Sequence, residues 1–185
     1  MIKSAQLQLS PPRLFIIMGV SGTGKSTLAK QMADEFGYVF VDADDFHSEQ
    51  AKKHMAANQP LTDEMRQPWL SSILSHLHSL YQQEKSVVLA YSGLKSAHRD
   101  LFRASCFRCH FFCLMGDKAI ITKRVTQRQG HFFSPDLLDS QLAAMEFPQD
   151  DEVDVNIINI DRPFLRVANE INNIVKEIVE LENND

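Results

Sequence analysis

Basic charge, cysteine and long apolar runs are all scarce in this sequence. Its 19 Lys and Arg residues are outnumbered by 24 Asp and Glu, giving a net charge of −5, which argues against nucleic-acid binding through a broad basic face. Three cysteines, without a signal peptide, do not make a disulfide framework and predict a reducing compartment, the cytoplasm. The apolar run 14–20 is too short to cross a membrane. We therefore expect neither a nucleic-acid nor a membrane partner, while a local basic cleft for a small anion stays possible.

The chain is long enough for one domain with a hydrophobic core. Its 185 residues are 44% hydrophobic, and no repeat, low-complexity tract or linker divides them. We expect a short flexible leader over 1–12 and a single domain over 13–185. Strand-like runs alternate with helical patterns, which indicates an α/β fold with a parallel sheet. The expected strands, each suited to burial on both faces, are 14–18, 38–41, 86–91, 110–115 and 155–160.

Three stretches have apolar residues at helical spacing, and each is expected to pack on the sheet. The first begins at Lys25 and ends at Gly37, a residue that accepts the left-handed conformation of a helix C-cap. The three apolar stripes are Leu28, Ala29, Met32, Ala33 and Phe36, then Trp69, Leu70, Ile73, Leu74, Leu77 and Tyr81, and finally Val167, Ile171, Ile174, Val175 and Ile178.

Residues 19–26 read Gly-Val-Ser-Gly-Thr-Gly-Lys-Ser between an expected strand and an expected helix. Glycines let the backbone turn with its N–H groups inward, and the helix N-terminus favours negative charge. Lys25 then reaches the β- and γ-phosphates, and Ser26 has the hydroxyl for Mg²⁺. The context makes a chance match improbable and predicts an ATP-binding P-loop, which a switch, a motor or a kinase can all use. The expected ATP contacts are Gly19, Ser21, Gly22, Thr23, Gly24, Lys25, Ser26 and Thr27.

Carboxylates follow the second expected strand, where ligands of parallel sheets bind. Asp42 and Asp44 share one face if this segment is extended. A carboxylate here can orient or deprotonate an acceptor hydroxyl, or hold Mg²⁺ through water. The alternative is a helix N-cap, which applies most to Asp45. His47 is open between a substrate contact and a solvated or capping residue.

A second basic feature is predicted to be a closing lid, around residues 124–135. Arg124 and Arg128 are one helical turn apart, and Gly130-His131 follows as a possible hinge. Lid arginines would stabilise charge on the transferred phosphoryl group and closure would exclude water. An exposed basic helix face is the alternative.

Cations also follow the third expected strand. Lys95 and Arg99 come shortly after it, and Arg66 precedes it. A planar guanidinium is a natural partner for a carboxylate, so these three are candidates for an anionic acceptor. On spacing alone, surface solvation explains each of them better.

The order of these strings resembles the gluconokinase family over essentially the whole domain. The strings are the P-loop, Asp42-Ala43-Asp44 with His47, Pro60-Leu61-Thr62-Asp63, Pro68-Trp69-Leu70, Ser92 with Leu94-Lys95, Arg99-Asp100, and Gly130-His131-Phe132 with Leu137-Leu138-Asp139-Ser140-Gln141. The resemblance implies ATP-dependent phosphorylation of D-gluconate at its 6-hydroxyl, a homodimer, and a three-layer P-loop kinase fold. That fold has a five-stranded parallel sheet ordered 2-3-1-4-5, helices on both faces and a small lid.

Carried over to this chain, the resemblance assigns roles to particular residues. Asp44 would act on the acceptor hydroxyl, Ser26 and Asp42 would lie nearer Mg²⁺, and Lys25, Arg124 and Arg128 would act catalytically on phosphate charge. The residues implied to bind gluconate are Asp44, His47, Arg66, Lys95, Arg99 and His131.

This chain departs from the family pattern near the implied acceptor site. It has Tyr91 where the family usually has Cys, Gly93 for Ala, Ser96 for a basic residue, His98 for Tyr, and Asn58 for Gly. These changes leave two alternatives to gluconate phosphorylation: a kinase of another sugar acid or shikimate-like acceptor, or a non-catalytic ATP-binding module.

Overall fold

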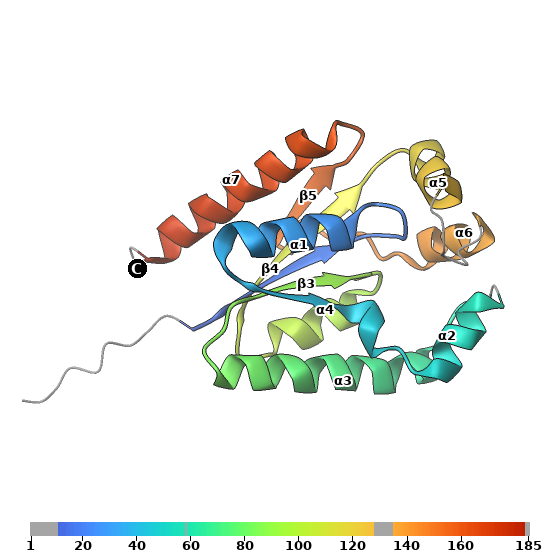
Figure 1. Cartoon of the computed structure of the whole chain (residues 1–185), viewed down its shortest axis with the longest axis horizontal. Coiled ribbons are helices and arrows are strands. Elements are labelled where there is room, and N and C mark those ends of the chain that lie inside the picture. Colours follow the sequence, from blue (N-terminus) through green and yellow to red (C-terminus); the bar gives the residue numbers. More distant parts are fainter. Residues whose placement is uncertain (1–10, 58, 128–134, 184–185) are drawn as a thin grey trace, which may run out of the picture.

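The computed structural model describes residues 11–57, 59–127 and 135–183, and the fold is a twisted sheet between two layers of helices (Figure 1). The five strands pair in parallel in the order β2-β3-β1-β4-β5, which confirms the order that the family resemblance implies. They lie within two residues of the ranges that the apolar runs predict. The strands are β1 (Arg13–Met18), β2 (Val39–Asp42), β3 (Val87–Tyr91), β4 (Arg108–Met115) and β5 (Val155–Asn159).

The central strand β1 contributes side chains to two hydrophobic cores, one on each face of the sheet. Phe15 and Ile17 belong to one buried cluster, and Leu14, Ile16 and Met18 to the other, because successive side chains of a strand point to opposite faces. Helices α1 and α7 cover the first face, and α3 and α4 cover the second (Figure 1). The helices are α1 (Lys25–Phe36), the 3-10 helix η1 (Ala43–Phe46), α2 (Glu49–Ala56), α3 (Asp63–Gln82), α4 (Ser96–Arg103), α5 (Lys118–Gln127), α6 (Pro135–Ala144) and α7 (Phe164–Asn183).

The three expected apolar stripes do lie on α1, α3 and α7 and contribute to these cores. Helix α1 ends as predicted, with Gly37 in the left-handed conformation at φ 68°. Burial on both faces was wrong for the last strand, because β5 is an edge strand and Ile157 stays 53% exposed. Within the part of the chain that the structure describes, no helix is long and apolar enough to span a membrane.

The carboxyl ends of the strands all lead to one side of the molecule, where α2, α5 and α6 lie (Figure 1). The loop 19–24 leaves β1 there, η1 leaves β2, and the segment 92–95 leaves β3. The backbone ties two of these exits together, since Gly19 N donates to Ser92 O at 3.0 Å. The parallel topology therefore brings three segments to the same edge of the sheet. They are the P-loop (19–26), the acidic segment with Asp42 and Asp44, and the basic segment 92–95 with Lys95.

Candidate active site

The P-loop has a backbone that only glycine adopts readily. Gly22 and Gly24 have φ angles of 84° and 94°, in the left-handed region that penalises other residues. A Cβ added at Gly22 would lie 2.5 Å from Cγ2 of Val125, so α5 also packs directly on the loop. Apart from its two chain neighbours, no heavy atom of the described residues lies within 4 Å of a Cβ built at Gly24, which leaves open space there where the loop meets α1.

The loop is held in shape by its own side chains. Thr23 is buried and its hydroxyl donates to Val20 O at 2.8 Å, while Lys25 Nζ donates to the same carbonyl at 3.0 Å. The first turn of α1 contains no acidic residue, so nothing there competes with an anion for the positive end of the helix dipole. Ser26 and Thr27 are in that turn, as the sequence predicts. The residues present therefore fit a bound polyphosphate.

Gln141 of α6 also contacts the P-loop, which the sequence did not indicate. Its Oε1 accepts a hydrogen bond from Ser21 N at 2.7 Å. Residue 141 is far along the chain, and no local spacing could pair it with the loop. The contact connects α6, which follows the predicted lid, to the phosphate-binding backbone.

The segment from Asp42 to Asp44 is not extended, because Asp44 lies in the 3-10 helix η1. Asp42 and Asp44 therefore do not share one face, which the sequence predicted only for an extended segment. Asp42 is the last residue of β2, and its Oδ1 caps η1 by accepting from Asp44 N at 3.0 Å. The helix N-cap, which was the alternative mainly for Asp45, is therefore formed by Asp42. Asp44 projects from η1 with its side chain 81% exposed, a position from which it can meet a ligand.

His47 is buried rather than solvated. Its imidazole ring stacks on Trp69 with centroids 4.4 Å apart and is 7% exposed. Nε2 lies 3.8 Å from Asp44 Oδ1, and Nδ1 has no hydrogen-bond partner among the described groups. Burial lowers the pKa of His47, against the opposing pull of the Asp44 carboxylate. The side chain is thus a mainly neutral wall behind Asp44.

Arg66 and Lys95 meet at a single carboxylate, that of Asp63. Asp63 Oδ1 accepts from Arg66 NH1 at 2.8 Å, and Lys95 Nζ lies 2.8 and 2.7 Å from the two oxygens. These hydrogen bonds, from Lys95 first, lower the pKa of Asp63. The Asp63–Arg66 spacing of three was visible in the sequence, but Lys95 is 32 residues away and only the fold reveals it. The two cations are thus arranged to hold a carboxylate.

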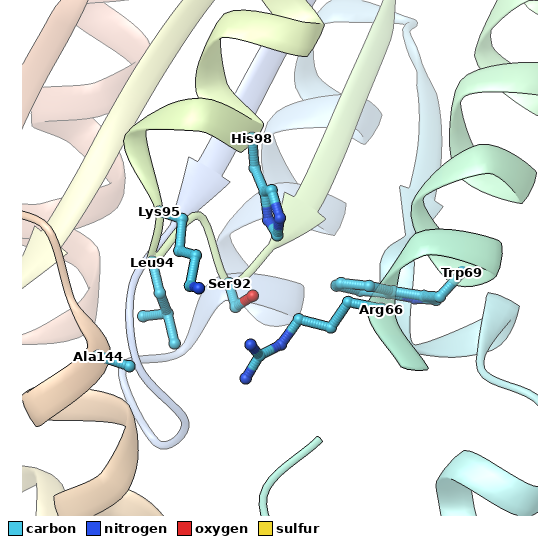
Figure 2. A pocket seen from close by; sticks show the side chains of 7 residues that line it. All are labelled: Arg66, Trp69, Ser92, Leu94, Lys95, His98 and Ala144. Carbon is cyan, nitrogen blue, oxygen red and sulfur yellow. The ribbon is translucent and has the colours of Figure 1, made fainter. Parts of the chain in front are cut away.

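A pocket lies beside this ion-pair group, at the end of β3 (Figure 2). Its volume is about 20 Å³, enough for roughly one water molecule. A larger hollow of about 370 Å³ lies between α2 and the start of α3, and Trp69 lines both. We expected Trp69 only in the core, since helical spacing cannot distinguish a core face from a pocket wall. The pocket is lined by Arg66, Trp69, Ser92, Leu94, Lys95, His98 and Ala144.

Arg99 has a different setting from the one expected for a gluconate ligand. It is 1% exposed and does not line the pocket. Its guanidinium pairs with Glu152 at 2.6 and 2.7 Å and donates to the carbonyls of Gly93 and Glu146. The setting has a physical reason, because a buried guanidinium needs a full set of acceptors. Arg99 therefore fixes the segment after β3 against the segment before β5.

Replacing Arg99 with Leu should lower the free energy of unfolding by about 3–5 kcal/mol, because Glu152 would remain buried with a weakened partner set. Hydrogen bonds from Arg99 and Arg103 hold the pKa of Glu152 at about 2. Because the pKa of Glu152 is lower in the folded than in the unfolded state, its carboxylate stabilises the fold fully at pH values above the unfolded pKa, roughly 4.3. This stabilisation is lost as the pH falls towards the folded pKa of about 2. Urea unfolding at pH 7 and pH 3 measures both effects, and the difference between wild type and variant should shrink at pH 3.

The double variant Arg99→Leu/Glu152→Leu is the matched control for this prediction. It removes both charges, so it should recover part of the lost stability. A stable Arg99→Leu protein with a raised KM for an acidic acceptor would contradict the structural role and restore the role expected from the sequence.

The predicted lid is only partly described. Arg124 lies on α5, is exposed, and donates to Ile160 O at 3.2 Å. Arg128 and His131 lie outside the described residues, as does most of the 124–135 segment. The leader over 1–12 also falls largely outside them, although Pro12 O accepts from Arg108 N at 3.1 Å. The lid and the leader stay predictions.

The departures from the family pattern have separate surroundings. Tyr91 is 1% exposed and bonds His98, which lines the pocket. Gly93 has φ 64° and packs on Met18, whose Cβ would be 2.6 Å from an added Cβ. Ser96 donates its N–H and its hydroxyl to Glu146. Asn58 lies outside the described residues. Tyr91 does not line the pocket itself, and it contacts the pocket through His98 and Trp69, which do.

Among residues 11–57, 59–127 and 135–183, no group of three or more His, Cys, Asp or Glu residues is placed to hold a metal ion. A Mg²⁺ ion that travels with ATP does not need such a group, because phosphate oxygens and water supply most of its ligands. The hydroxyl of Ser26 and the carboxylate of Asp42 are of the right chemistry for the remainder. The P-loop and this donor set fit a magnesium nucleotide.

Comparison with known proteins agrees with this geometry. Residues 14–148 match the family model described as an AAA domain. The chain is 37% identical to a probable gluconokinase of Dictyostelium discoideum, covering 96% of this chain and 90% of that protein. It is 33% identical to the thermoresistant gluconokinase of Escherichia coli (strain K12), covering 89% and 94%. The crystal structure of a gluconokinase from Sinorhizobium meliloti 1021 superposes with a TM-score of 0.82 at 30% identity, covering 94% and 97%. With a P-loop, an acidic segment and a pocket lined by cations at one sheet edge, the chain belongs to the gluconokinase family.

Proposed function

We propose that the protein transfers the γ-phosphoryl group of ATP to the 6-hydroxyl of D-gluconate, giving 6-phospho-D-gluconate and ADP. The observation that carries the choice of acceptor is the grip of Arg66 and Lys95 on the Asp63 carboxylate beside the pocket. A carboxylic acid substrate presents the same group, and a bidentate guanidinium suits it well. The pocket holds roughly one water molecule, so it must widen to admit gluconate. Gluconate binding would widen the pocket by drawing Arg66 and Lys95 away from Asp63.

In the proposed reaction, each residue at this edge of the sheet has a separate role in phosphoryl transfer. The acceptor oxygen attacks the γ-phosphorus, the bond to the β–γ bridging oxygen breaks, and ADP leaves with that electron pair. Asp44 accepts the hydroxyl proton, and it is exposed enough to release the proton to solvent afterwards. Lys25 and the P-loop N–H groups hold the phosphates, and Arg124 offsets charge. Mg²⁺, bound through Ser26 and Asp42, would neutralise charge on the phosphate oxygens.

We also propose a single kinase domain over residues 13–185 that acts as a cytoplasmic homodimer. The three cysteines are all free thiols, which supports a reducing compartment. The dimer rests on the family resemblance. Light scattering at micromolar concentration measures the mass of the protein in solution directly. A mass near that of one 21.1 kDa chain would contradict the proposed dimer.

Magnesium-dependent ADP release tests the proposed activity. ATP is supplied with D-gluconate, shikimate, other sugar acids or nucleoside monophosphates in separate reactions, and ³¹P NMR identifies the phosphorylated position of the product. We expect a selective response to gluconate and loss of turnover with EDTA. A response to another acceptor would keep the kinase and change its substrate. ATP binding without any acceptor-stimulated turnover would favour a regulatory module.

A further inference from the structure

Tyr91 is held in one orientation beneath the pocket. Its ring stacks on Trp69 with centroids 5.1 Å apart and an interplanar angle of 19°, and it meets Phe102 edge-on, also at 5.1 Å. The residue is 1% exposed. Its hydroxyl lies 2.7 Å from Nδ1 of His98. Two aromatic contacts and one short hydrogen bond therefore fix the hydroxyl relative to His98.

The chemistry of the pair decides which atom donates. Burial raises the pKa of Tyr91, so the phenol keeps its proton. Burial and the nearby cations Arg66 and Lys95 lower the pKa of His98, which favours the neutral imidazole. If Nδ1 carried the proton, the buried phenolic proton would need a second acceptor, and among the described residues it has none. Donation from the phenol to Nδ1 satisfies both groups.

The consequence is a fixed tautomer. A neutral imidazole whose Nδ1 accepts a hydrogen bond carries its proton on Nε2. His98 is a wall residue of the pocket, and its ring points into the space among Ser92, Lys95 and Trp69 (Figure 2). Within the described part of the chain, Nε2 has no hydrogen-bond partner. The N–H is thus available to a ligand in the pocket.

We propose that His98 is a substrate-binding residue that donates from Nε2 to an oxygen of the acid acceptor, and that Tyr91 is its positioning residue. The inference rests on the proposed function and deepens it by naming a specificity determinant. A fixed neutral donor adds a directional contact to the charged contacts of Arg66 and Lys95. Sites built around such a donor discriminate strongly against analogues that lack the matching oxygen.

The phenol can be removed without removing the ring, using Tyr91→Phe. Two-dimensional ¹⁵N–¹H NMR of imidazole nitrogens reports the tautomer of His98 in the ligand-free protein. We expect the wild type to hold the Nε2–H tautomer and Tyr91→Phe to show a mixture of the two. In kinetics, Tyr91→Phe should raise KM for gluconate about threefold to tenfold with KM for ATP unchanged. Tyr81→Phe, near the C-terminal end of α3 and against Phe107 rather than His98, is the matched control and should change neither readout.

His98 itself is tested with two variants. His98→Ala should raise KM for gluconate at least tenfold, and His98→Gln, which retains an amide donor, should recover part of that loss. A pure Nε2–H tautomer in Tyr91→Phe would overturn the positioning role. Unchanged KM for gluconate in both His98→Ala and His98→Gln, with unfolding midpoints like the wild type, would overturn the contact. A wild type inactive on gluconate would instead refute the proposed acceptor, while the NMR still reads the tautomer.

Discussion

Lys25→Ala should lower kcat by at least about 10²–10³-fold, the loss typical of a deleted charge at the reacting phosphates. Lys25 is the first residue of α1, and its Nζ is held near the loop through Val20 O at 3.0 Å. This places the ammonium over the phosphate-binding backbone before ATP arrives. Because the stabilised charge grows during transfer, the effect should fall on kcat more than on KM for ATP. Steady-state kinetics with ATP and gluconate measure both constants.

The matched control for this prediction lies on the same helix. Lys30 is exposed on α1, so Lys30→Ala removes an identical charge without touching the loop and should keep wild-type turnover. Turnover within threefold of wild type in Lys25→Ala would exclude Lys25 from the chemistry. Equal losses in both variants would point to helix stability, which thermal unfolding of the two proteins separates.

Most of the fold was predictable because its signals are local. Short apolar runs fixed the five strands within two residues, and the glycine-rich loop between β1 and α1 fixed the nucleotide-binding end. Gly37 marked the end of α1 because a left-handed C-cap needs glycine. The burial of β5 was misjudged because an apolar run does not reveal whether its strand is central or at an edge.

The acceptor side was less predictable because its contacts join distant residues. Arg99 and Lys95 looked alike in sequence, as cations shortly after one strand. In the structure Lys95 pairs with Asp63 at the pocket, whereas Arg99 is buried against Glu152. Glu152 is 53 residues beyond Arg99, and no pattern along the chain links them. The same holds for Gln141 and the P-loop. The sequence thus indicated which charged residues are candidates for the site. It did not indicate their partners, which distinguish charges available to a ligand from charges with a structural role.

Asp44→Asn should lower kcat by about 10²–10⁴-fold, the usual contribution of a positioned general base, with little change in KM for ATP. The Asp44 carboxylate lies in the first turn of η1 and is 81% exposed, while Asp42 caps that helix. Asn retains the shape and the oxygen acceptor but cannot take a proton, so the variant isolates proton transfer from packing. The loss should persist at saturating gluconate, because it arises in the transition state.

The neighbouring residue provides the control that makes this result decisive. Asp45→Asn makes the same substitution one residue along the same 3-10 helix, on another exposed side chain, and should keep nearly full activity. Asp42→Asn should retain the cap through its amide oxygen and differ from Asp44→Asn by a raised requirement for Mg²⁺. If Asp44→Asn turns over normally while Asp42→Asn is inactive, the base is Asp42 and the roles of the two carboxylates are reversed. If both are active, proton removal by a carboxylate is not part of the mechanism, and transfer depends on the phosphate cradle and the cations alone.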